Sequence, residues 1–274
     1  MAFRSHVLRS IDPARRSHQA IIALVLLAAV SGLAATWYSD ASRWLVIEAA
    51  GATFLVWMLG RELDPDRDAT ALVAAVAGGV WAVLGQPVDL LILAGLGVAA
   101  RLVVESTGRR PLTTDLLTIA AGATLISLRP LGFVAGFGLA VAIYVDVRLS
   151  AEPSPVGVVV SVAAAAGAGV IASTAGDFPQ QLPDLMPWLV ASIAGLSLLA
   201  VLRDPPPPTS QVDSRRKSFL RKDRLQSARV LVGLLCLAGA LLAGEEGAAV
   251  VPAVFCLGLA LASSEVERSV RARL

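Results

Sequence analysis

Residues 156–173 read VGVVVSVAAAAGAGVIAS, an apolar run without a single charged side chain. A helix needs about 20 apolar residues to cross the hydrocarbon core of a bilayer. The run is continuous, whereas a strand of a membrane barrel would alternate apolar and polar residues with period two. This stretch is therefore typical of a transmembrane helix.

Runs of the same kind recur along the chain, and the charged residues gather between them. Of the 274 residues, 56% are hydrophobic and 16% are charged, against about 25% charged in an average soluble domain. The sequence predicts an all-α, polytopic transmembrane helical bundle with spans at 19–37, 43–60, 69–84, 88–104, 112–128, 130–147, 155–173, 187–202, 227–243 and 248–264. The first run follows a basic leader but is long enough to span, so we expect a retained helix rather than a cleaved signal peptide.

The basic residues predict the orientation of these helices. With the N-terminus in the cytoplasm, all of the 23 lysines and arginines except Arg43 and Arg129 fall on the cytoplasmic side, as the positive-inside rule requires. Both termini are therefore expected in the cytoplasm. Arginine greatly outnumbers lysine and alanine is abundant, a bias that indicates a GC-rich genome and a prokaryotic plasma membrane.

The prolines Pro205–Pro208 cannot form a regular helix and predict an extended linker. We expect a leader at 1–18, an eight-helix bundle at 19–204, a linker at 205–226, a C-terminal hairpin at 227–264 and a tail at 265–274. The basic end of the linker is either a solvated cytoplasmic loop or a segment held against anionic lipid. Its residues are Arg215, Arg216, Lys217, Arg221, Lys222 and Arg224.

Two predicted helices carry similar motifs. Ala94–Ala99 reads AGLGVA and Ala135–Ala140 reads AGFGLA, and an acid follows ten residues after the first glycine of each, at Glu105 and Asp146. Looser copies end at Glu62, Asp204 and Glu265. The pattern predicts a helical hairpin repeated five times, with hairpins 69–106 and 112–147 superposing. Small residues let membrane helices approach closely, so we expect helix packing at Gly51, Gly95, Gly97, Gly136, Gly138, Gly195 and Gly258.

Ten helices with both termini inside, in fewer than 300 residues, resemble the drug/metabolite transporter superfamily in helix count and size. No family motif accompanies the resemblance. It implies a carrier built from two inverted five-helix halves, which would match odd-numbered helices to even-numbered ones. The repeat instead matches even-numbered helices to one another, in the same orientation.

The segment RELDPDRD at 61–68 is the densest polar motif. Its carboxylates could hold Mg²⁺ or Ca²⁺ at the membrane surface and, through the metal, a lipid phosphate; the weak candidate ligands are Glu62, Asp64, Asp66 and Asp68. The competing interpretation is that Asp64, followed by Pro65, caps the next helix. Acid–proline pairs recur at other predicted turns, which favours capping.

Charged side chains within a bilayer mark candidate functional sites. Glu48 is a weak candidate for contact with a substrate, and its alternative role is that of an interfacial carboxylate. Arg101 and Glu105 are four residues apart, so we expect an ion pair along one helix face. His6 and His18 fall in the leader, outside the predicted spans.

The sequence contains none of the common catalytic motifs, such as HExxH, GxSxG or a Walker loop. No enzyme activity and no cofactor are therefore expected. A transporter-like protein for a small solute or a lipid fits the ten-helix pattern best. The alternatives are a non-catalytic membrane scaffold or assembly subunit, and an intramembrane enzyme acting on a lipid phosphate. The expected partners are the bilayer and a membrane protein or second copy, with no nucleic acid.

Overall fold

The computed structural model describes residues 14–38, 42–107, 111–129, 132–150, 153–175, 187–202, 208–209, 220–242 and 249–271. All regular structure within these ranges is helical. The helices are α1 (Arg16–Tyr38), α2 (Leu45–Leu63), α3 (Asp68–Val83), α4 (Leu90–Val104), α5 (Thr113–Ile126), α6 (Gly132–Leu149), α7 (Pro155–Ala175), α8 (Pro187–Leu202), α9 (Lys222–Leu242) and α10 (Val251–Arg271).

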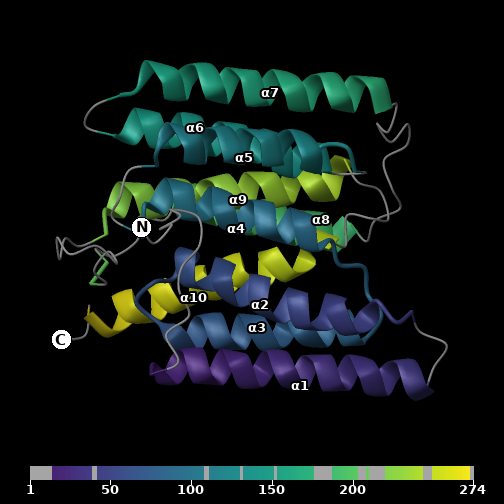
Figure 1. The fold of residues 1–274 in the computed structure, drawn as a ribbon. Coiled ribbons are helices and arrows are strands. Elements are labelled where there is room, and N and C mark those ends of the chain that lie inside the picture. The colour runs from purple at the N-terminus through teal and green to yellow at the C-terminus, as the bar shows by residue number, and fades with distance from the viewer. Residues whose placement is uncertain are drawn as a thin grey trace.

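The helix axes lie roughly parallel or antiparallel to one another, and the helices are stacked from α7 at one face of the bundle to α1 at the other (Figure 1). Two groups of three helices pack internally, one formed by α1, α2 and α3 and the other by α5, α6 and α7. Between them lies α4, which packs against both α2 and α6, together with α9, which packs against α4 and α6. The bundle is completed by α10 on α2 and α3 and by α8 on α9.

Each predicted span coincides with one of these helices, so the prediction of a helical bundle is confirmed. The bounds differ most near the C-terminus, where α9 begins at Lys222 and α10 continues to Arg271. Parts of the predicted linker and tail are therefore helical. Four helices, α1, α6, α7 and α9, are long and apolar enough to cross a membrane, which supports association with a membrane.

Small residues bring the core helices close together. Ala49, Ala52 and Val56 in α2 are completely buried. A Cβ atom at Gly60 would lie 3.0 Å from the Cα atom of Ala71 in α3. Small residues of this kind let two helix backbones approach closely.

The packing differs from five repeated hairpins. The described residues of α3 and α4 scarcely touch, whereas the contact between α2 and α3 is the most extensive in the bundle. Gly95 faces Ala135 of α6, while Gly136 lies against Ala123 of α5. The equivalent glycines therefore make different contacts, because α4 is held between two helix groups and α6 packs within its own group.

The other glycines predicted to mediate packing are placed variously. A Cβ at Gly51 would meet Leu90, one at Gly97 would meet Met58 and one at Gly138 would meet Leu235. A Cβ at Gly258 would have more room, because the nearest side-chain atom, in Leu196, would be 3.5 Å away. Around Gly195, no atom of the described residues lies within 4 Å of that position.

Gly136→Ala should destabilise the protein, and Gly122→Ala should not. A Cβ at Gly136 would lie 2.6 Å from the backbone oxygen of Ala123, and overpacking of this kind costs about 1–3 kcal/mol. The same change at Gly122 meets nothing within 4 Å and improves helix propensity. Thermal unfolding of both variants in detergent checks the prediction, and equal melting temperatures would contradict it.

Candidate functional site

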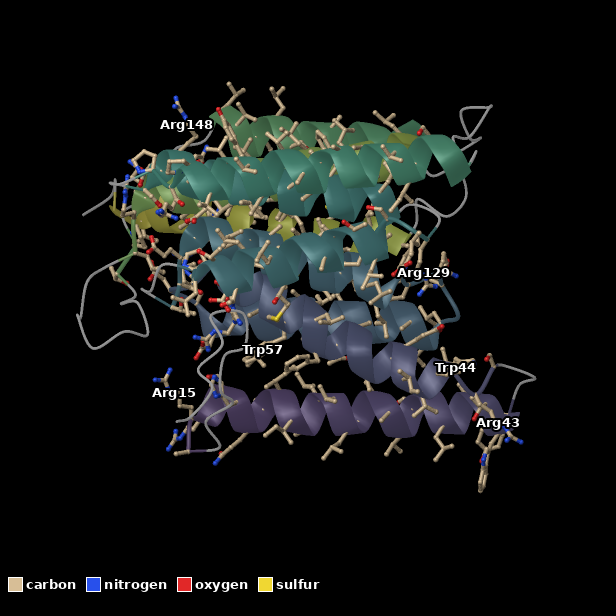
Figure 2. The ribbon with its side chains drawn as sticks, turned by 45° about the horizontal axis from the view of Figure 1, so that its top comes forward. Arg15, Arg43, Trp44, Trp57, Arg129 and Arg148 are labelled. Carbon is tan, nitrogen blue, oxygen red and sulfur yellow. The ribbon has the colours of Figure 1, made fainter. Side chains whose placement is uncertain are left out.

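Buried charges gather at one end of the bundle, where α2, α4 and α6 terminate and α9 begins. We call this the charged end. Figure 2 shows Arg15 and Arg148 at this end, and Arg43 and Arg129 at the opposite end. A charge away from water requires partners, so these side chains define the candidate site.

Arg224 lies at the centre of the first of two ion-pair clusters. It is in the first turn of α9 and only 2% exposed. Its Nη1 atom lies 2.7 Å from Oδ1 of Asp146 in α6, and its Nη2 atom lies 3.1 Å from Oε2 of Glu105 after α4. Nη1 also donates to the backbone oxygen of Val103 at 3.0 Å, and Nη2 to Oγ of Ser150 at 3.3 Å. One guanidinium therefore ties together the ends of three helices.

Glu105 reaches Arg224 from an unusual backbone conformation. It ends α4 with φ of 56°, the left-handed conformation, and its N–H donates to the backbone oxygen of Arg101. Glycine is the usual residue at such a helix end, since a side chain there costs roughly 1–2 kcal/mol. The contact with Arg224 gives a physical reason for glutamate at this position.

The second cluster joins α2 to α4. Nε of Arg101 lies 2.8 Å from Oε1 of Glu62, and the two side chains are 6% and 1% exposed. The expected ion pair between Arg101 and Glu105 is therefore wrong. The left-handed turn at Glu105 carries its carboxylate to Arg224, and Arg101 packs toward α2. Beside this cluster, Nε of Arg229 in α9 donates to the backbone oxygen of Leu63 at 2.9 Å.

The acidic segment does not converge on one point. Glu62 pairs with Arg101. Asp68 pairs with Arg61 at 2.7 Å, and both oxygens of Asp66 accept from the backbone N–H of Thr209 at 3.1 Å. Among the described residues, no three Asp, Glu, His or Cys side chains are grouped as metal ligands. The candidate metal residues thus face separate partners.

Asp64 does not cap α3, and that interpretation is wrong. The N-cap of α3 is Arg67, and the helix begins at Asp68, while Asp64 is the C-cap of α2. Its Oδ2 atom accepts a hydrogen bond of 2.6 Å from Oγ of Ser263 in α10, and its Oδ1 atom lies 3.5 Å from Arg67. Asp64 therefore links α10 to the charged end.

Only some of the basic residues of the predicted linker lie among the residues that the structure describes. Arg215, Arg216 and Lys217 lie outside the described residues. Arg224 was expected with them in a solvated loop or against anionic lipid, but it is buried, where two carboxylates take the place of water around its guanidinium.

Arg221 and Lys222, by contrast, keep their side chains at or near the surface. Arg221 pairs with Asp223 and donates to the backbone oxygen of Leu149.

Two other residues considered from the sequence, Glu48 and His18, lie in α2 and α1. Glu48 is half-buried in the first turn of α2, where the helix dipole favours a negative charge. His18 belongs to α1 rather than to a leader, and is 2% exposed. Its ring meets the ring of Trp57 edge-on at 5.5 Å between centroids, and Figure 2 shows Trp57 on the side of α2 that faces α1.

Asp146 and Arg224 were missed as site residues, although the sequence held a signal for one of them. Asp146 is the acid that follows the second glycine motif, and Glu105 follows the first. The motif showed that an acid recurs but not what the acid binds. Its partner Arg224 is 78 residues further along the chain than Asp146, so no local spacing links the two.

Comparison with known proteins gives no relative from which a role could be transferred. No protein-family model, no curated protein and no solved structure matches the chain.

Arg224→Met should cost about 3–5 kcal/mol of stability, because it removes the guanidinium from the buried Asp146 and the partly exposed Glu105. Arg221→Met is the matched control, since Arg221 is 53% exposed and its surface pair contributes about 1 kcal/mol or less. Unfolding of both variants in detergent by denaturant measures the difference. Equal losses would show that Arg224 is not held as described.

Proposed function

We propose that this chain is a transporter-like protein of a prokaryotic plasma membrane, with ten membrane-spanning helices and a small solute or lipid as substrate. The charged end is placed in the cytoplasm, together with both termini. The positive-inside rule supports this orientation, because all of the 23 lysines and arginines except Arg43 and Arg129 fall on the side predicted to be cytoplasmic. Figure 2 shows Arg43 and Arg129 at the end opposite to the charged end. The shorter helices such as α5, with 14 residues, suit a bundle in a locally thin bilayer.

The observation that carries the proposal is the placement of the ion pairs between helix groups. Glu62 of the α1–α3 group binds Arg101 on α4, and Asp146 of the α5–α7 group binds Arg224 on α9. Both pairs lie at the charged end. In carriers, one helix group moves against another around a central site. Ion pairs at one end suit such motion, because water entering on opening would solvate the separated charges.

Only one part of the predicted hairpin repeat is used in the proposal, namely the acid that follows the glycine motif. The acids that follow the motifs of α4 and α6, Glu105 and Asp146, both bind Arg224. The acid at the end of α2, Glu62, also forms a buried ion pair. We propose that the repeated acid is a device for closing the cytoplasmic end, used at three successive even-numbered helices.

A membrane scaffold or assembly subunit is the second candidate. It is favoured by the exposed apolar side chains of α7, among them Val159, Val162 and Val170, each more than 60% exposed. In that case the ion pairs would hold the bundle in one conformation. The two candidates therefore differ in whether the charged end opens.

Spin-label distances can distinguish the two functions. In a background with Cys236→Ala and Cys256→Ala, one label pair is placed at the exposed residues Ala69 and Thr114, at the starts of α3 and α5. A second pair is placed at the exposed Leu84 and Leu128, at the opposite ends of these helices. Glu62→Gln with Asp146→Asn should lengthen the first distance and shorten the second.

The size of the effect follows from the energies of the ion pairs. If the closed state loses about 3 kcal/mol of stability, the ratio of open to closed molecules rises by more than a hundredfold. An open state populated at about 1% would then equal the closed one. Asp223→Asn, which removes an exposed pair at the same end, is the control. Unchanged distances in the double variant would refute the carrier and favour the scaffold.

Reporter fusions test the topology. Fusions after Asp40, Gln86, Asp177 and Glu246 should report the outside, and those after Asp66, Arg110, Pro153 and Arg216 the cytoplasm. The basis is the distribution of lysine and arginine between the loops. Two or more reversed sites would refute the ten-span arrangement.

A further inference from the structure

An apolar pocket of about 160 Å³ lies between α1 and α3, far along both helices from the ion-pair clusters. Side chains from α1, α2 and α3 line it, including Leu24, Ala28, Thr53, Val76, Gly79 and Val80. The hydroxyl of Thr53 donates to the backbone oxygen of Ala49 at 2.7 Å. The hydroxyl that α2 contributes to the lining therefore already donates its hydrogen within the helix.

The size and lining of the pocket suit a hydrocarbon. Pockets for drug-sized ligands are roughly 300–1,000 Å³, so a whole solute of that size would not fit. An apolar cavity of about 150 Å³ remains dry and accepts hydrocarbon groups. Most of the lining is apolar, so a polar occupant would find only the hydroxyls of Ser31 and Thr53 to replace its hydrogen bonds to water.

The surroundings of the pocket indicate where the hydrocarbon comes from. Its rim carries exposed aliphatic side chains from both helices: Leu27 on α1 is 61% exposed, and Val80 and Leu84 at the end of α3 are 52% and 68% exposed. Since α1 is long and apolar enough to cross a membrane, this rim would face acyl chains. The pocket therefore opens toward the bilayer.

Polar groups that suit a lipid headgroup lie beyond one end of the pocket. Ser31 of α1 lines the pocket, and the seven residues from there to Tyr38 rise about 10 Å. Figure 2 shows Arg43 and Trp44 at this end of the bundle, and both are exposed. Aromatic residues favour the headgroup level, and an arginine there complements a phosphate.

The geometry points to this pocket as a binding site for one acyl chain of a phospholipid whose phosphate lies near Arg43. The site is separate from the ion pairs, so it stands whether or not the charged end opens. It requires only that α1 and α3 lie in a membrane.

Photo-crosslinking tests the site. The full-length protein is placed in vesicles of phosphatidylethanolamine and phosphatidylglycerol containing a trace of phosphatidylglycerol with a diazirine on its acyl chain. Crosslinks should concentrate in residues 24–31 and 76–84. Ser31→Leu fills the pocket and should lower this labelling about tenfold, the effect expected when roughly two methylene groups lose their burial.

Ala34→Leu is the matched control, because Ala34 is exposed on the same helix and does not line the pocket. It should leave the labelling unchanged, and both variants should unfold at the wild-type temperature. Labelling spread evenly over the exposed faces of α1 and α7, or unchanged by Ser31→Leu, would overturn the site. Arg43→Gln should also lower the labelling, and no change there would overturn the placement of the phosphate.

Discussion

The buried guanidinium of Arg224 is the constraint on which the charged end depends. Removing an ion from water costs several kcal/mol even after the protein relaxes, so a cation that is 2% exposed needs anions beside it. Asp146 and Glu105 supply them, and the oxygen of Val103 accepts a further hydrogen bond. These groups come from α6 and from the end of α4. The three helices α4, α6 and α9 must therefore meet at this end.

The position of α4 follows from the same constraint. Arg101 is directed to Glu62 on α2, and Glu105 is directed one turn later to Arg224 on α9. The helix can serve both neighbours because its packing faces carry small residues. Gly95 lies against Ala135 of α6, and Ala99 and Ala100 are buried. Small side chains thus set the helix distances, and the ion pairs fix which ends come together.

The sequence predicted the helices well and their contacts poorly. Apolar runs mark helices directly, because burial in lipid demands continuous apolar length. Contacts between distant segments leave no such mark: Arg101 was paired with Glu105 by its spacing, yet its partner Glu62 is 39 residues away. Asp64 likewise matched a capping pattern, but Ser263, 199 residues away, binds it. His18 was misplaced because a helix can begin inside a basic leader.

The contacts at the charged end are made by charged side chains where apolar side chains could also have packed. Well-packed apolar residues in place of a buried ion pair often give equal or greater stability. Rigidity alone therefore does not call for Glu62 with Arg101 or Asp146 with Arg224. Charges differ from apolar residues when the contact separates, because water solvates exposed ions but gains nothing from exposed apolar surface. An interface that opens to water is thus better closed by ion pairs, and the proposed carrier would have such an interface.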